Sequence, residues 1–218
     1  MPAGKISVVT HRVKTSRRGE SVGRNEVKRM VKRAINYGKE KKHYDLNFED
    51  IDVIDTGNTA LLTGVTNEDS DTTRIGDRIT MQSLEYKFRV VPQATASKMR
   101  LVLLQWKQDS SNAPTLSTLF EQGGTYTLGF DNWDEMKSNA HQILFDRTYN
   151  LAGSASNGAR YITGRVKLFG KKIPKKQIQF DNSASSGWDH IYAIVFSDKA
   201  TSGGPLLDYS SRLIYTDA

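Results

Sequence analysis

The sequence of 218 residues has no cysteine, only five prolines and no long apolar run. Without cysteine there can be no disulfide bond, no thiolate zinc site and no cysteine nucleophile. No apolar stretch approaches the roughly 20 residues of a membrane helix, and the first residues turn basic without the apolar core of a secretory signal. These absences are compatible with an intracellular or particle-forming protein and argue against a membrane partner.

Catalytic and metal-binding patterns are also missing. The four histidines, His11, His43, His141 and His190, are not spaced as a metal pair. There is no G-x-S-x-G turn and no glycine-rich phosphate loop. Asp69 and Asp71 carry the oxygen ligands that calcium prefers, but a solvated acidic loop is the preferred interpretation. We therefore expect no enzyme activity and no cofactor.

Positive charge is concentrated at the N-terminal end of the chain. Residues 1–42 hold 13 Lys and Arg against 3 Asp and Glu, a net charge of +10, whereas the whole chain carries +7. Residues 43–218 are therefore net −3. Such segregation indicates that the arm neutralises a polyanion and that the body has a separate role. We predict a basic arm over 1–42 and one folded domain over 43–218.

A basic amphipathic helix is predicted within the arm, near residues 25–38. Asn25 is the expected N-cap and Gly38 the expected end. Lys28, Arg29 and their neighbours fall on the face opposite the apolar stripe, which is expected to dock on protein. That stripe consists of Val27, Met30, Val31, Ala34 and Ile35.

The basic face and the residues before it are expected to contact nucleic-acid phosphates. Because no base-reading motif accompanies them, binding should show little sequence preference and should weaken steeply with salt. A solvated charged face and a helix lying on an anionic membrane are the alternatives. Basic pairs in the arm also match a nuclear import signal. The expected nucleic-acid-binding residues are Arg12, Lys14, Arg17, Arg18, Arg24, Lys28, Arg29, Lys32 and Arg33.

Beyond residue 42 the pattern becomes strand-like and predicts an all-β fold, an eight-stranded jelly-roll β-sandwich. In the first segment Tyr44, Leu46 and Phe48 alternate with polar residues, and Ile51 and Val53 continue out of phase after a break. The third segment is almost continuously apolar, which is typical of a strand buried on both faces. The predicted strand segments are 41–55, 76–91, 97–108, 141–151, 159–170, 173–182, 188–198 and 208–217.

Three further features of the body are interpreted from the sequence. Residues 113–122 are predicted to form the one short helix of the body, with Pro114 at its start. The three tryptophans, Trp106, Trp133 and Trp188, are expected to anchor the core or an interface. A turn bears Lys171, Lys172, Lys175 and Lys176, and an exposed charged loop is preferred over phosphate contact for these lysines.

Five short motifs occur along the body in a fixed order. They are RIGDRITMQSLEY (Arg74–Tyr86), KMRLVLLQW (Lys98–Trp106), ILFDRTYNL (Ile143–Leu151), IYAIVFSD (Ile191–Asp198) and RLIYTD (Arg212–Asp217). Together with the basic arm, they make the chain resemble the single-jelly-roll capsid proteins of small icosahedral viruses. The nearest resemblance is to viruses with circular single-stranded DNA that encode a replication initiator, the circovirus-like group. Asp146 is expected to begin a turn in that pattern.

The resemblance implies a coat protein that self-assembles into a virion shell of about 60 copies, T=1, and packages a single-stranded DNA genome through its arm. A host receptor is implied but not identified, and assembly in the host nucleus is compatible with the basic pairs. The arm is less rich in Arg than those of circoviruses and includes a helix. Coat proteins of small RNA or satellite viruses are therefore an alternative, as is a non-capsid nucleic-acid-binding β-sandwich.

Overall fold

The structure is a computed structural model that describes residues 26–31, 40–68, 72–121, 133–134, 139–153, 161–181, 184–200 and 203–217. The chain divides into two units, Met1–Gly38 and Lys39–Ala218. In the first unit the described residues form a helical turn over 26–31, inside the predicted helix. No described helix is both long and apolar enough to cross a membrane.

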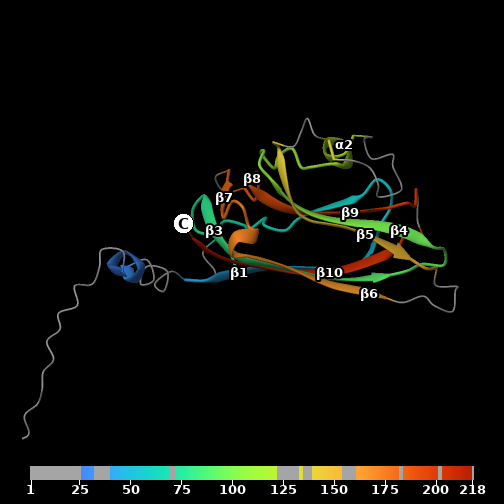
Figure 1. The fold of residues 1–218 in the computed structure, drawn as a ribbon. Helices are drawn as coiled ribbons and strands as arrows, with labels where there is room; N and C mark the ends of the chain where they lie inside the picture. Colours follow the sequence, from blue (N-terminus) through green and yellow to red (C-terminus); the bar gives the residue numbers. More distant parts are fainter. Residues whose placement is uncertain are drawn as a thin grey trace, which may run out of the picture. The chain divides into compact units, whose positions relative to one another are not determined.

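The second unit is a sandwich of two antiparallel sheets (Figure 1). One sheet has the order β1 (Lys42–Asp52), β10 (Leu206–Asp217), β3 (Arg78–Val91), β7 (Gln177–Phe180) and β8 (Gly187–Trp188), and β6 (Ile162–Phe169) also pairs with β3. The other sheet has the order β2 (Asn58–Leu61), β9 (His190–Ser197), β4 (Ser97–Trp106) and β5 (His141–Leu151).

Strand pairing is nested along the chain, which is the signature of a jelly roll. β1 pairs with β10, β2 with β9, β3 with β6 and β4 with β5. Pairing of β10 with β3 and of β9 with β4 then joins these four strand pairs into the two sheets. The predicted jelly-roll β-sandwich is confirmed.

The predicted set of eight strands omits one principal strand of the jelly roll. That strand is β2, in a segment for which no strand is predicted, while the predicted strand 173–182 contains the short β7 that extends the first sheet. β2 has only four residues, too few to show a period of two. It is extended because each residue pairs with β9, from Asn58 opposite Val195 to Leu61 opposite Tyr192.

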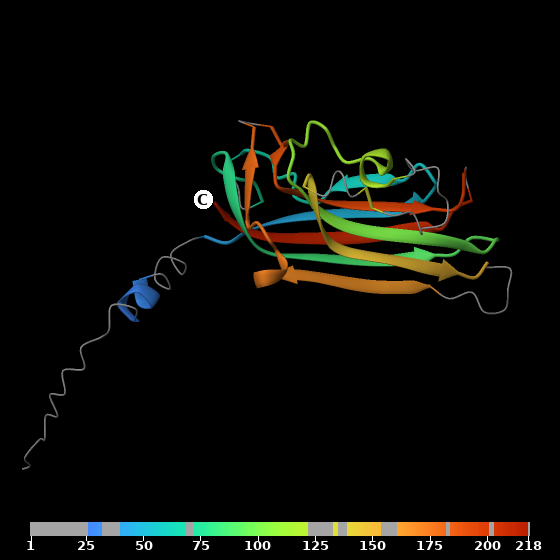
Figure 2. The ribbon, with the colours of Figure 1, turned by 45° about the horizontal axis from the view of Figure 1, so that its top comes forward.

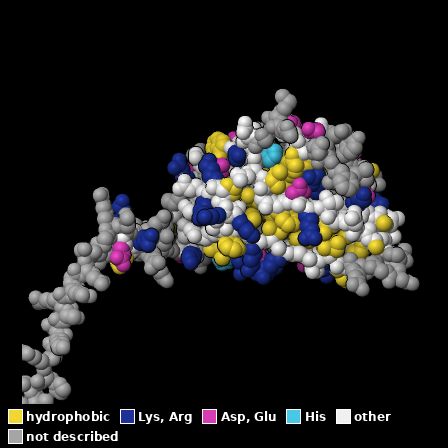
Figure 3. Space-filling model, viewed as in Figure 1, with side chains coloured by type: hydrophobic (Ala, Val, Ile, Leu, Met, Phe, Trp, Pro, Cys, Tyr) yellow, Lys and Arg dark blue, Asp and Glu magenta, His cyan; other side chains and the backbone are white. Residues whose placement is uncertain are grey.

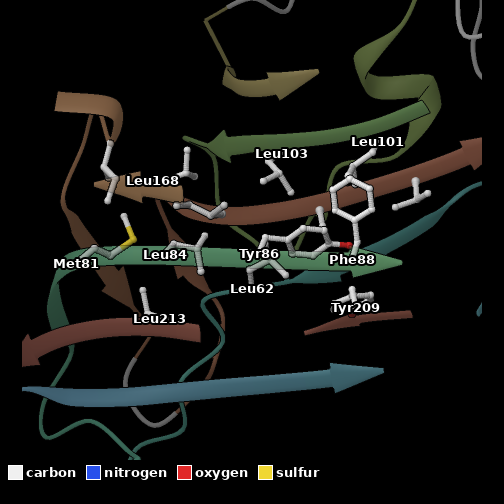
Figure 4. Packing of buried hydrophobic residues seen from close by; sticks show 14 of the residues in the cluster. Leu62, Met81, Leu84, Tyr86, Phe88, Leu101, Leu103, Leu168, Tyr209 and Leu213 are labelled. Atoms are coloured by element: carbon white, nitrogen blue, oxygen red, sulfur yellow. The ribbon is translucent and has the colours of Figure 1, made fainter. Parts of the chain in front are cut away.

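The main core lies between the two sheets and is built largely from the inward residues of β3 (Figure 4). Met81, Leu84, Tyr86 and Phe88 project from β3 toward the opposite sheet, and the residues between them are polar or charged. From Leu84 onward, alternation with a period of two places one set of side chains in the core and the other in solvent, and the register shift between Met81 and Ser83 brings Met81 onto the same face. The pattern that predicts β3 therefore also fixes which of its faces is outward.

β4 is buried on both faces, as its continuous apolar sequence predicts. Leu101 and Leu103 point into the main core. Val102 and Leu104 lie in a second cluster, with Leu119 of the short helix α2 (Leu116–Leu119) and neighbouring loop residues on the outer side of the sheet. The four-stranded sheet is thus covered on both faces.

Helix α2 is shorter than the predicted 113–122. Its first turn is fixed by Thr118, whose hydroxyl accepts the Thr115 N–H at 2.8 Å. The helix ends at Leu119 because Phe120 is extended and forms a β-bridge with Trp133.

The break in β1 occurs where the sequence predicts it. The register with β10 shifts between Phe48 and Ile51, and Asp50 has a φ of 54°. The Asp50 N–H, which loses its place in the ladder, donates to Asp208 Oδ1 at 2.9 Å. A β-bulge of this kind explains why the apolar alternation resumes out of phase.

Candidate nucleic-acid interface

The described part of the arm presents both of its faces to solvent. Lys28 and Arg29 are exposed on the helical turn, and their contact with phosphates stays a prediction. Val27, Met30 and Val31 are 46%, 54% and 52% exposed. Docking of this apolar stripe on a protein surface stays a prediction.

The other predicted binding residues lie outside the described residues. They are Arg12, Lys14, Arg17, Arg18, Arg24, Lys32 and Arg33 of the arm, and Asp69 and Asp71 of the acidic loop. In the portion that the structure describes, no group of three or more His, Asp or Glu side chains is placed to hold a metal ion.

A second basic region lies on the body, in the segment from β6 through the 3-10 turn η2 (Gly170–Lys172) to β7. Residues 161–180 contain six Lys and Arg and no Asp or Glu, although residues 43–218 as a whole are net −3. All six side chains are exposed. In Figure 3, dark-blue Lys and Arg side chains gather along the lower margin of the body, where β6 lies in Figure 1. The six are Arg165, Lys167, Lys171, Lys172, Lys175 and Lys176.

Only part of this positive charge is neutralised within the fold. Arg165 pairs with Glu85 of β3, and Lys175 pairs with Asp189. For Lys167, Lys171, Lys172 and Lys176, no carboxylate among the described residues lies within ion-pairing distance. The sequence interpretation of the lysine turn as exposed is confirmed, and its use for phosphate contact stays a prediction.

A buried glutamine holds the lysine turn in place. Gln105 of β4 is 1% exposed, and its Nε2 donates to the backbone oxygens of Lys175 at 2.7 Å and Asp189 at 2.9 Å. Its Oε1 accepts the Lys175 N–H at 3.2 Å. These three bonds fix the backbone of the turn, so the lysine side chains extend from a rigid base.

The outer face of the six-stranded sheet carries paired charges elsewhere. Arg212 donates to both oxygens of Asp45, at 2.8 and 2.7 Å, and this lowers the pKa of Asp45. Arg165 lowers the pKa of Glu85 in the same way. Pairing leaves these positions close to neutral, and the unpaired positive charge remains on β6, η2 and the lysine turn.

A groove separates the edges of the two sheets beside this basic segment. Its volume is about 490 Å³, and it runs between β5 and β6. Ile143 and Phe145 contribute apolar walls from β5, while Lys167, Lys171 and Lys172 line the opposite side. The groove brings cations and apolar surface together at an open edge of the sandwich.

The three tryptophans do not form one site. Trp106 is 3% exposed and lies in the second cluster, beside the His141 ring at 6.4 Å. Trp133 packs on Phe120 at 4.7 Å between ring centroids. Trp188 belongs to β8 and pairs with Gln179. Trp106 and Trp133 are anchors of the fold, as expected.

Asp146 is a strand residue, and the expectation that it begins a turn was wrong. It lies in the middle of β5, opposite Val102 of β4. Its carboxylate accepts two hydrogen bonds from Arg100, at 2.8 and 2.7 Å, and one from Trp133 Nε1 at 3.1 Å. A carboxylate paired across the ladder in this way can remain inside a strand.

No protein-family model and no curated protein matches the chain. Among solved structures, it is similar to Desmodium yellow mottle tymovirus, with a TM-score of 0.40, 10% identity and coverage of 82% of this chain and 88% of that chain. Similarity to turnip yellow mosaic virus has a TM-score of 0.40, 12% identity and coverage of 83% and 82%. The decameric BFDV capsid protein matches with a TM-score of 0.18, 7% identity and coverage of 80% and 98%.

Proposed function

We propose that this protein is the coat subunit of a small icosahedral virus and that its arm binds the packaged single-stranded genome. The observation that carries the proposal is the joining of a jelly-roll body to a segment of 42 residues with a net charge of +10. A body with a net charge of −3 does not attract a polyanion as a whole, so the arm supplies the long-range attraction. The five-motif resemblance to jelly-roll coat proteins supports the same role.

The charge of the arm is sufficient for packaging in a shell of the proposed size. About 60 arms in a closed icosahedral particle would present on the order of 600 positive charges, enough to offset several hundred phosphates. The proposal covers single-stranded DNA, which the sequence resemblance favours, and single-stranded RNA, which is the alternative. Virions, and the host nucleus during assembly, are the proposed locations.

Assembly is the first prediction. Purified protein should form closed particles of uniform diameter, because a subunit built on one β-sandwich fits the 60-copy shell. Negative-stain electron microscopy and light scattering over a range of salt and pH measure this directly. If only monomers or dimers form under every condition, the protein is a non-capsid nucleic-acid-binding β-sandwich instead. If particles do form, nuclease treatment of the nucleic acid extracted from them decides between DNA and RNA.

The arm is the second prediction. Changing Arg29, Lys32 and Arg33 together to Gln should preserve the helix, because Gln is a good helix former. It should also lower the amount of nucleic acid packaged per particle. The slope of log binding constant against log salt concentration for single-stranded nucleic acid should become shallower by about 2, at roughly 0.7 per phosphate contact. The ratio of absorbance at 260 and 280 nm and a salt titration measure the two effects.

A charge-matched control separates the arm from the overall charge of the protein. Arg78, Lys107 and Lys199 lie outside both the arm and residues 161–180, so changing these three to Gln should leave packaging near the wild-type value. Equal losses in the two triple variants would show that the protein responds only to net charge and that the arm has no special role.

A further inference from the structure

β6 lies at an edge of its sheet and has an open outer face. Its one pairing partner among the described strands is β3, and Figures 1 and 2 both show it at the margin of the body. The even-numbered residues of β6 face the core: Leu168 is 3% exposed, and a Cβ on Gly164 would lie 2.2 Å from the Phe88 ring. Gly164 is therefore needed to admit Phe88, and the odd-numbered residues of β6 must face outward.

These outward residues form an ordered row of aromatic, hydroxyl and cationic groups. Tyr161 and Phe169 are 67% and 56% exposed at the two ends of the row. Thr163, Arg165 and Lys167 lie between them and are also exposed. At about 3.3 Å per residue, the two rings stand about 26 Å apart along the strand.

Each ring has a cation beside it. The Arg89 guanidinium lies 6.0 Å from the centroid of the Tyr161 ring, and Lys172 Nζ lies 5.8 Å from that of the Phe169 ring. A ring beside a cation can stack on a base while the cation contacts the adjoining phosphate.

We propose that the outer face of β6, with Lys167 and Phe169 on the strand and Tyr161 directly before it as contacts, is a second binding site for single-stranded nucleic acid. The two rings stack on unpaired bases, and Lys167 between them contacts the phosphates. At 3.4 Å per stacked nucleotide, 26 Å corresponds to about eight nucleotides, within the 4–16 nucleotides typical of such surfaces. The identity of this ligand rests on the proposed function, while the site itself belongs to the body and not to the arm.

The two kinds of group predict two different effects on binding. Stacking does not depend on counterions, so Tyr161→Ala or Phe169→Ala should weaken binding of a fluorescein-labelled dT20 about tenfold without changing the salt slope. Lys167→Gln should reduce that slope by about 0.7. Fluorescence anisotropy from 0.05 to 0.4 M NaCl measures both quantities in the full chain. The Arg29, Lys32 and Arg33 to Gln variant serves as the background, because it weakens the competing arm.

Controls of similar exposure distinguish the row from the general surface. Ile75→Ala removes a side chain that is 55% exposed before β3, and Lys107→Gln removes an exposed cation after β4. Both should bind as the background does. Tyr161→Phe and Phe169→Trp should restore binding, because the stacking ring remains.

A photocrosslink identifies the contact directly. An oligonucleotide with 5-iodouracil at every third position should crosslink to Tyr161 and Phe169, identified by peptide mass spectrometry. Crosslinks confined to residues 1–42, or aromatic variants that bind dT20 like the background, would overturn the site. The site would also be overturned if the protein bound a heparin oligosaccharide more tightly than dT20 and the Tyr161→Ala and Phe169→Ala variants bound heparin equally well. Failure of particle formation in the electron microscope would contradict the coat-protein role but would leave these crosslinks unaffected.

Discussion

Arg74→Ala should destabilise the body by about 3–5 kcal/mol, the range expected when a buried charged group is removed from its partners. Arg74 has no solvent exposure. Its guanidinium donates to the backbone oxygens of Val65 at 3.3 Å, Ala184 at 2.7 Å and Gly76, and it lies 4.1 Å from the centroid of the Phe180 ring. Truncation would leave three acceptors without a donor and a cavity over the ring.

The measurement is urea unfolding of the full chain, followed by far-UV circular dichroism. Arg89→Ala is the matched control, because Arg89 forms an ion pair with Asp208 at 2.6 Å but is 57% exposed. A solvent-screened surface pair of this kind contributes little to stability. Equal losses for the two variants would show that the buried contacts of Arg74 add nothing to stability.

Acidification should destabilise the protein through His190 before any carboxylate contributes. Burial lowers the pKa of His190 from 6.5 to about 4, and the positive charge of Arg74 adds to this effect, while the Thr63 hydrogen bond and Asp109 oppose it. The ring has no solvent exposure, its Nδ1 lies 3.0 Å from Thr63 Oγ1, and Phe180 packs edge-on at 5.0 Å. A neutral ring fits this site and a charged ring does not.

The pH window follows from the direction of the shift. Between pH 6.5 and 4 the unfolded chain binds a proton that the folded chain does not, so stability falls as pH falls through this window. Above pH 6.5 the stabilising effect is complete, and the total loss is about 3 kcal/mol at 1.36 kcal/mol per pKa unit. The lowered pKa values of Asp45, Glu85 and Asp208 act in a more acidic range, below their ordinary values of 3.8 to 4.5.

Urea unfolding at pH 7, 6, 5 and 4.5 tests this prediction. His190→Asn should lower the free energy of unfolding at pH 7 and should reduce its dependence on pH above pH 4.5. His43→Gln should keep the wild-type pH dependence because His43 is exposed. An unchanged slope in the His190 variant would assign the acid sensitivity to another group.

Strands with a long, regular pattern were predictable from the sequence, and β2 was not. β3 shows a regular alternation from Leu84 to Val90, and β4 is apolar over most of 10 residues. β2 depends instead on a partner more than 130 residues away, so its four residues carry no local signal. Asp146 misled the prediction for the same reason, since its Arg100 partner lies on a different strand.

The basic arm could be predicted because net charge is additive along a sequence, whereas the surface of β6 depends on which face packs inward. Phe169 is as apolar as Ile162 and Val166, so composition does not distinguish the two faces. Gly164 identifies the inward face of β6, because only a residue without a Cβ leaves room there for the Phe88 ring. The burial of Arg74 has no local signal either, since it depends on Ala184, which lies 110 residues later in the chain.

The pairing of β1 with β10 also sets the order of events during synthesis. Residues of β1 pair with partners 154 to 173 positions later in the sequence. At 5–20 residues per second, a ribosome takes on the order of ten seconds to cover that interval. Residues 1–42 thus leave the ribosome well before β1 can pair with β10. During that interval a segment with a net charge of +10 is close to the messenger RNA.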